Sequence, residues 1–255
     1  MSATMPAAFL GHGSPMNALL DNRWTRTWNE FGRSIPTPRA VLSISAHWYT
    51  RGTGVTAMAM PPTIHDFGGF PQELFDYRYP APGDPAFAKE VSELLDIPVS
   101  LDDRWGLDHG TWSVLCHVYP NADVPVVQLS IDATEPPSWH WDLARQLQPL
   151  RDDGVLIVGS GSITHNLSIL KFGATRPEAW AAAFDDHVAA ALRDGNKTAL
   201  VDYAKHPSGR TSVPTPDHYL PMLSIAALRR DDEIVTTITD GFDAGTLSMR
   251  SFRVG

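Results

Sequence analysis

Short apolar runs rich in β-branched residues alternate along the chain with amphipathic segments of helical period. Runs of this length bounded by turn residues predict strands, and their alternation with helices predicts an α/β fold. We expect a single domain with a central, mostly parallel sheet flanked by helices. The predicted strands are residues 7–10, 40–45, 55–59, 124–131, 154–158 and 234–239.

Four amphipathic segments carry helix start and stop signals. Asp21 is the predicted N-cap of a helix in which Trp24, Trp28 and Phe31 are spaced to share one face, with Gly32 at its end. The other three predicted helices begin at Asp84–Pro85, at Thr175 with Pro177, and at Thr215–Pro216, and the second of these ends at Gly195.

No internal repeat, low-complexity tract or linker-like charge run interrupts the pattern. We therefore predict one catalytic domain over residues 1–255. The longest irregular segment is the Pro- and Gly-rich stretch 61–85. Loops of this length inside compact domains are usually functional, so this stretch is expected to border a site.

Composition excludes several classes of protein. With 43% apolar and 19% charged residues the chain is neither disordered nor fibrous, and a net charge of −9 disfavours nucleic acid and anionic membranes as partners. The one cysteine, Cys116, excludes a disulfide framework and a cysteine-rich zinc module. No run approaches the roughly 18 apolar residues of a membrane span, so we expect a cytoplasmic protein. The sequence does not indicate its oligomeric state.

Ten histidines contrast with the single cysteine, and several of them follow predicted strands. His12 follows the run 7–10, His47 follows 40–45, and His165 comes shortly after 154–158. His218 is predicted in the first turn of the last helix. Ligands of open α/β sheets bind beyond the carboxyl ends of the strands, so these imidazoles are expected to meet there. Such a nitrogen-rich site suits Zn²⁺ or Fe²⁺.

Three more residues have contexts that suggest a role. His109, in a Gly- and Asp-rich segment, is a candidate acid or base or a hydrogen-bond donor to a substrate. His65 lies in the long irregular stretch, and Trp48 follows His47, so both are candidates for contacting a substrate. Each of these side chains could instead brace a loop or fill the core.

Six segments, taken in order, resemble the DOPA-type extradiol ring-opening dioxygenases. This family belongs to the class III extradiol superfamily, which includes the catalytic subunit of protocatechuate 4,5-dioxygenase. The resemblance extends from residue 7 to the C-terminus. The segments are HGSPM at 12–16, SAHW at 45–48, HDFGGFP at 65–71, GLDHG at 106–110, HNL at 165–167 and TPDHYLP at 215–221.

The resemblance implies a mononuclear non-haem metal, with Zn²⁺ as purified and Fe²⁺ for catalysis. It implies that a small aromatic catechol and O₂ react to give a ring-opened semialdehyde. His12, His47 and His218 match metal positions, and His165 matches either a fourth ligand or an acid/base histidine. His109 matches another active-site histidine, and Asp217 is a weaker candidate ligand because the family's better-known members use a carboxylate there.

Two other functions use the same histidines. A zinc-dependent hydrolase would employ a metal-bound water as its nucleophile. A non-catalytic metal-binding protein would hold zinc without turnover. Oxygen consumption separates the dioxygenase from both.

Overall fold

The computed structural model describes residues 4–255. Eight strands form one sheet in the order β4-β3-β5-β2-β6-β1-β10-β7. Its centre, β5-β2-β6-β1, is parallel, whereas β10 and β7 add an antiparallel edge. The strands are β1 (Ala7–Gly11), β2 (Ala40–Thr50), β3 (Thr53–Thr56), β4 (Val99–Asp102), β5 (Val126–Asp132), β6 (Val155–Gly161), β7 (Val235–Thr239) and β10 (Ser251–Val254). The predicted α/β class with a mostly parallel sheet is confirmed.

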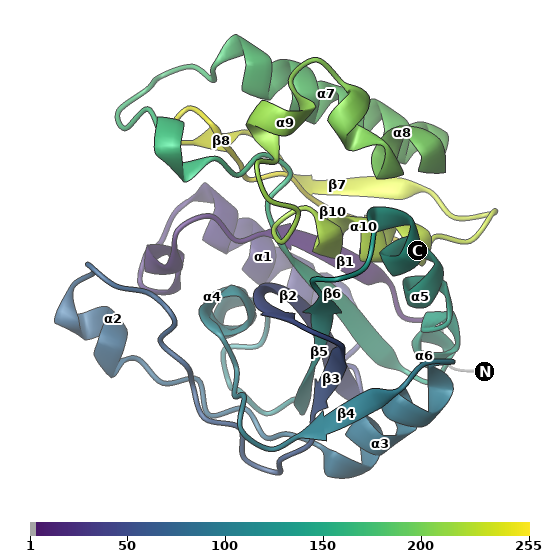
Figure 1. Ribbon diagram of the computed structural model, residues 1–255. Coiled ribbons are helices and arrows are strands. Elements are labelled where there is room, and N and C mark those ends of the chain that lie inside the picture. Colours follow the sequence, from purple (N-terminus) through teal and green to yellow (C-terminus); the bar gives the residue numbers. More distant parts are fainter. Residues whose placement is uncertain (1–3) are drawn as a thin grey trace.

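Helices cover both faces of this sheet (Figure 1). One face carries α1 (Arg23–Ser34), α2 (Gln72–Asp76) and α4 (His109–Val118). The other carries α3 (Pro85–Leu94), α5 (Pro137–Arg145), α6 (Gln148–Asp152) and α10 (Leu220–Ala227). Beyond α10 lie α7 (Ala179–Asp194), α8 (Lys197–Val201) and α9 (Gly209–Ser212), beside a short hairpin of β8 (Phe242–Asp243) and β9 (Leu247–Ser248).

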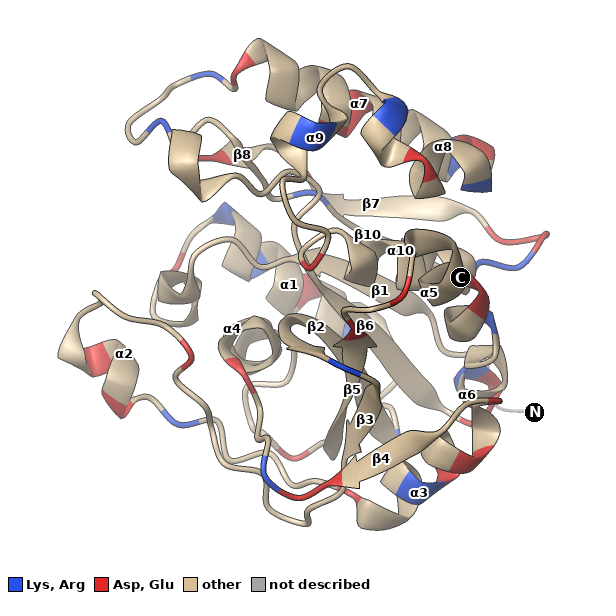
Figure 2. Ribbon diagram, in the orientation of Figure 1, with Lys and Arg blue, Asp and Glu red and all other residues tan. Residues whose placement is uncertain are grey.

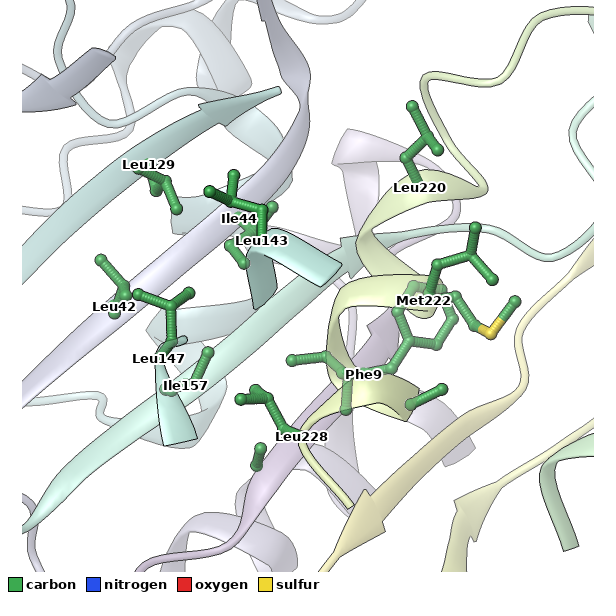
Figure 3. Packing of buried hydrophobic residues seen from close by; sticks show 14 of the residues in the cluster. Phe9, Leu42, Ile44, Leu129, Leu143, Leu147, Ile157, Leu220, Met222 and Leu228 are labelled. Atoms are coloured by element: carbon green, nitrogen blue, oxygen red, sulfur yellow. The ribbon is translucent and has the colours of Figure 1, made fainter. Parts of the chain in front are cut away.

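The sheet separates two apolar cores. Alternate residues of the central strands point to opposite faces, so Phe9, Leu42 and Ile157 enter one core while Leu10 and Val41 enter the other. Figure 3 shows the first core, in which strand residues pack against Leu143 and Leu147 and against residues of α10. Charged residues lie mainly on the outer helices and loops (Figure 2). Cys116 is buried in the second core, as predicted.

The predicted helix boundaries differ from the observed ones where other bonds compete for the backbone. Asn22, not Asp21, caps α1, because its side chain accepts the amide protons of Trp24 and Thr25. Asp21 instead pairs with Arg26 on the surface. The helix also continues past Gly32 to Ser34.

Two later helices begin further along the chain than predicted. The segment after Thr175 bonds to the β8–β9 hairpin, with the Glu178 amide donating to the Gly245 carbonyl, so α7 begins only at Ala179. The predicted end at Gly195 is confirmed, with this residue in the left-handed region at φ 66°. The His218 carbonyl accepts the Ser162 amide at 2.9 Å, and α10 begins at Leu220. His218 therefore lies in the turn before the helix rather than in its first turn.

The strand forecasts at 7–10, 124–131, 154–158 and 234–239 correspond to β1, β5, β6 and β7. The run at 40–45 extends to Thr50 in β2, and the run at 55–59 lies at 53–56 in β3. β4, β8, β9 and β10 were not predicted, nor were α2, α4, α5, α6, α8 and α9. Within residues 4–255 no helix is both long and apolar enough to cross a bilayer.

Candidate metal centre and its cavity

Five histidines meet where the central strands end. His12 directly follows β1, and His47 lies inside β2, at a register break between Ile44 and Tyr49. His109 is the first residue of α4. His165 follows β6, and His218 lies in the turn before α10. All five line one cavity.

The hydrogen bonds of His12 fix which of its nitrogens faces the cavity. Ser160 donates its hydroxyl proton to the Gly110 carbonyl at 2.5 Å. Its oxygen is therefore left to accept the proton on His12 Nδ1, at 2.9 Å. This bond assigns the proton of the neutral ring to Nδ1 and leaves a free lone pair on Nε2.

Asp66 orients two further rings. Its Oδ2 atom lies 3.4 Å from His47 Nδ1, and its Oδ1 atom lies 3.0 Å from His109 Nδ1. Oδ1 also accepts the backbone amide proton of His109 at 2.9 Å. Burial alone would raise the pKa of Asp66, but its contacts with His109 outweigh burial and lower it. The carboxylate thus stays charged and turns His47 Nε2 away from itself, into the cavity.

Asp217 holds His218 in the same way. His218 Nδ1 hydrogen-bonds Asp217 Oδ2, and its Nε2 atom is buried without a hydrogen-bond partner among residues 4–255. Burial would raise the pKa of Asp217, but the bond with His218 lowers it to about 2. The ring of His165 stacks on that of His218, with the ring centres 3.4 Å apart and the planes 5° from parallel.

Three imidazoles of the cluster are held neutral by their surroundings. Burial is the main cause that lowers the pKa values of His12 and His47 well below the ordinary range, and the neighbouring histidines lower them further. Burial, followed by the charge of His218, lowers the pKa of His165 to about 3. At neutral pH these three imidazoles are therefore uncharged and can donate lone pairs.

The arrangement fits a metal ion. His12 Nε2 and His47 Nε2 lie 3.3 Å apart, although both carry lone pairs when each neutral ring keeps its proton on Nδ1, facing Ser160 or Asp66. Two facing lone pairs repel unless a cation lies between or beside them. His12, His47 and His109 each offer a ligand atom, and these atoms lie within 4.8 Å of one another. Dispersed histidines of this kind suit zinc or iron.

The cavity around the histidines has apolar walls. Its volume is about 460 Å³, within the roughly 300–1,000 Å³ of small-molecule sites. The described residues that line it include two carboxylates, those of Asp66 and Asp243. The apolar wall includes Phe67, Phe70, Leu167, Leu170, Phe172 and Leu247. Such a surface accepts a flat aromatic ring and excludes water from around it.

Two predicted substrate contacts lie elsewhere. Trp48 is one residue along β2 from His47, so its ring points to the other side of the strand and stacks on Trp105, 6.0 Å away. His65 hydrogen-bonds the Tyr77 carbonyl and packs on the edge of Phe67, behind the cavity wall. Neither lines the histidine cavity.

Sequence reasoning missed two of the residues that orient the rings. Asp66 had a signal, because it stands in the motif at 65–71, but its distance of 43 positions from His109 hides their contact. Ser160 stands in a glycine-rich strand end with no polar pattern to mark it. Asp217, a weaker ligand candidate in the sequence, faces Nδ1 of His218 and supports this ring.

Comparisons with known proteins identify a family and several relatives. Residues 7–248 match the family described as the catalytic LigB subunit of aromatic ring-opening dioxygenase. The chain is 51% identical, over its full length and 97% of the relative, to the 4,5-DOPA dioxygenase extradiol of Escherichia coli K12. It is 36% identical to the protein of that name from Beta vulgaris, over 96% of this chain and 94% of that one.

A solved structure shares the fold. The crystal structure of an uncharacterized protein from Escherichia coli K12 superimposes with a TM-score of 0.87 at 45% identity. The match covers 98% of this chain and all of that one. The two chains therefore share one overall fold along nearly their whole length.

Proposed function

Because the chain belongs to the family of the catalytic LigB subunit of aromatic ring-opening dioxygenases, and is an extradiol ring-cleaving dioxygenase, we propose that it opens a catechol substituted like DOPA. The reaction adds both atoms of O₂ and breaks a ring bond beside one hydroxyl-bearing carbon, giving a ring-opened semialdehyde. The observation that supports this best is the pair of imidazole lone pairs, on His12 and His47, facing each other in an apolar cavity.

We propose that His12, His47 and His218 hold the metal through Nε2, with His165 beside them as a fourth ligand or as an acid/base group. Ser160, Asp66 and Asp217 support this assignment, because each takes the Nδ1 side of a ring. When bound, the metal brings catechol and O₂ together and lets electron density pass from ring to oxygen. We propose Fe²⁺ for catalysis and Zn²⁺ as the ion found after purification.

His109 is the proposed proton carrier. It lies against His47, with ring centres 3.8 Å apart, and against Asp66, which can stabilise a proton on the ring. The closeness of its ring nitrogen to those of His12 and His47, within 4.8 Å, supports this role. A hydroxyl of the catechol must lose a proton on binding, and a proton must return as the O–O bond breaks. An imidazole can do either near neutral pH.

The remaining properties follow from the chain as a whole. We propose that residues 1–255 act as one catalytic domain in the cytoplasm, a setting supported by the single, buried cysteine. The net charge of −9 supports the absence of nucleic-acid and anionic-membrane partners. The apolar wall completes the site by removing water from around the ring.

Oxygen uptake tests the proposal. The protein is loaded with Fe²⁺ without oxygen, then given DOPA or another catechol together with O₂. We expect O₂ consumption and a yellow product; neither signal across a panel of catechols would refute the proposal. Conversion without O₂ consumption would indicate the zinc hydrolase, and tight zinc binding with no turnover would indicate a metal-binding protein.

Two variants test the roles of the histidines. His12→Ala should lose both metal and turnover, whereas His109→Ala should keep the metal and lose rate. His187→Ala is the matched control, because this histidine lies on α7 beside His206, outside the cavity. Loss of the metal from His109→Ala would contradict the proposed division of roles.

A further inference from the structure

The charges lining the cavity are unbalanced. Among residues 4–255, those that line it include no lysine or arginine, and their two carboxylates are Asp66 and Asp243. Asp66 is already engaged with His47 and His109. Asp243 is therefore the remaining charged side chain that can meet a substituent of the substrate.

Asp243 stands at the end of β8, in the short hairpin that closes one side of the cavity. Oδ1 of Asp243 accepts the Ala244 amide proton at 2.8 Å. Within residues 4–255, Oδ2 accepts no hydrogen bond and no cationic side chain lies within 4.0 Å of the carboxylate. The carboxylate is half-buried and retains an unused oxygen.

The surroundings of Asp243 strengthen its effect on a bound charge. Leu170, Phe172 and Leu247 line the same cavity, and apolar neighbours reduce the screening of a charge by water. The basic residue between Leu170 and Phe172, Lys171, is exposed and does not line the cavity. Its backbone amide donates to the Ala244 carbonyl at 2.8 Å, which ties the loop of Phe172 to the hairpin of Asp243.

Resting on the proposed function, we infer that Asp243 binds the ammonium group of the substrate's side chain. The site then selects catechols that carry an alkylammonium group and disfavours those whose only charge is a carboxylate. DOPA carries both charges, so its ammonium group pairs with Asp243 while its carboxylate extends toward solvent. The selectivity arises from a carboxylate with no competing cationic side chain, because no lysine or arginine is among the described residues that line the cavity.

Three catechols of matched shape test the inference. Dopamine carries an ammonium group, 4-ethylcatechol carries no charge, and 3-(3,4-dihydroxyphenyl)propionate carries a carboxylate. Oxygen uptake by the Fe²⁺-loaded enzyme gives kcat/KM for each. We expect dopamine to exceed 4-ethylcatechol by about fivefold, the scale of a partly screened ion pair, and the propionate to be the poorest.

Asp243→Asn keeps the bond to the Ala244 amide and removes the charge, so the ratio of dopamine to 4-ethylcatechol should fall close to one. Asp240→Asn is the matched control: it removes an exposed carboxylate three residues away that does not line the cavity, and the ratio should persist. A dopamine to 4-ethylcatechol ratio near one in the parent enzyme would overturn the inference, and so would a ratio that Asp243→Asn leaves unchanged. In either case turnover of the catechols would still support the proposed function.

Anaerobic calorimetry with the Zn²⁺-loaded protein separates the two proposals. If no catechol is turned over, the proposed function fails, yet the affinities still report on Asp243. Tighter binding of dopamine that is lost in Asp243→Asn would support the inference. Equal affinities for dopamine and 4-ethylcatechol would overturn it.

Discussion

Asp66→Asn is the substitution that best distinguishes a metal ligand, His47, from a proton carrier, His109. The carboxylate faces Nδ1 of His47 with one oxygen and Nδ1 of His109 with the other. Asparagine has nearly the same shape but only one acceptor oxygen, and its amide protons would face one of the two rings. At least one imidazole must then turn or shift its proton to the other nitrogen.

The size of the effect depends on which ring binds the metal. Loss of a group that orients a ligand typically costs 10–100-fold in metal affinity. Under the proposed roles His47 is a ligand and His109 is not, and the contact with His47 is the longer one, at 3.4 Å. We therefore expect about a tenfold loss of affinity, at the lower end of that range. If both rings were ligands, the loss would lie nearer a hundredfold.

Competition of the metal-free protein against a zinc chelator of known affinity measures this loss. Asp243→Asn is the control, because it removes a carboxylate of the same cavity that does not contact a histidine ring. Its zinc affinity should stay within about twofold of the parent, since an exposed or half-buried charge contributes little at a distance. An Asp66→Asn protein that binds zinc as tightly as the parent would refute the reasoning.

Three further outcomes concern the fold around the site. Glu233→Gln leaves the fully buried guanidinium of Arg151 without its charged partner and should lower the free energy of unfolding in urea by about 3 kcal/mol. Glu90→Gln, in an exposed ion pair, is the control and should lower it by less than about 1 kcal/mol. Burial by itself would raise the pKa of Glu233, but its contacts with Arg151 outweigh burial and lower this pKa below the ordinary value of 4.5. The ion pair therefore stabilises the fold above pH 4.5, and this stability is lost as the pH falls through the lower folded pKa. Urea midpoints across acidic pH should show this loss, and Glu233→Gln should abolish it. Gly161→Ala places a Cβ against the His218 carbonyl and should destabilise the fold by about 2 kcal/mol, with weaker zinc binding in the same chelator titration.

The central sheet was predictable because its strands are buried on both faces. The runs ending near Leu10 and Val158 are continuous stretches of apolar residues, which is the pattern of a parallel strand covered by helices. The edge strands lack that signal. β10 contains Ser251 and Arg253, and β4 has mainly exposed or half-buried residues, so their pairing depends on contacts far away in sequence.

The location of the candidate site was predictable from the sequence, but the orientation of its side chains was not. The positions of His12 and His165 after strands indicated where they would meet. No pattern indicated that the irregular end of β2 turns His47 toward them while Trp48 faces the other side. α4 was missed because its residues are buried all round, so no amphipathic period marks it, and His109 begins this helix.

The supporting carboxylates show the limit of sequence reasoning most clearly. The side chains of neighbouring residues often point apart, but those of Asp217 and His218 contact each other. Asp66 reaches His47 and His109 only through the course of the long irregular segment 61–85. That segment was expected to border a site because of its length, and it supplies both a wall and a carboxylate.

Anomalous scattering at the metal edge, from crystals grown with Zn²⁺, locates the ion and its ligands together. We expect one peak within bonding distance of Nε2 of His12, His47 and His218, roughly 2.0–2.1 Å, with His165 beside it and His109 free to carry a proton. A peak bound by His12, His47 and His109 with His218 left out would contradict the proposed roles. The absence of any ion from the histidine cavity would contradict the metal centre itself.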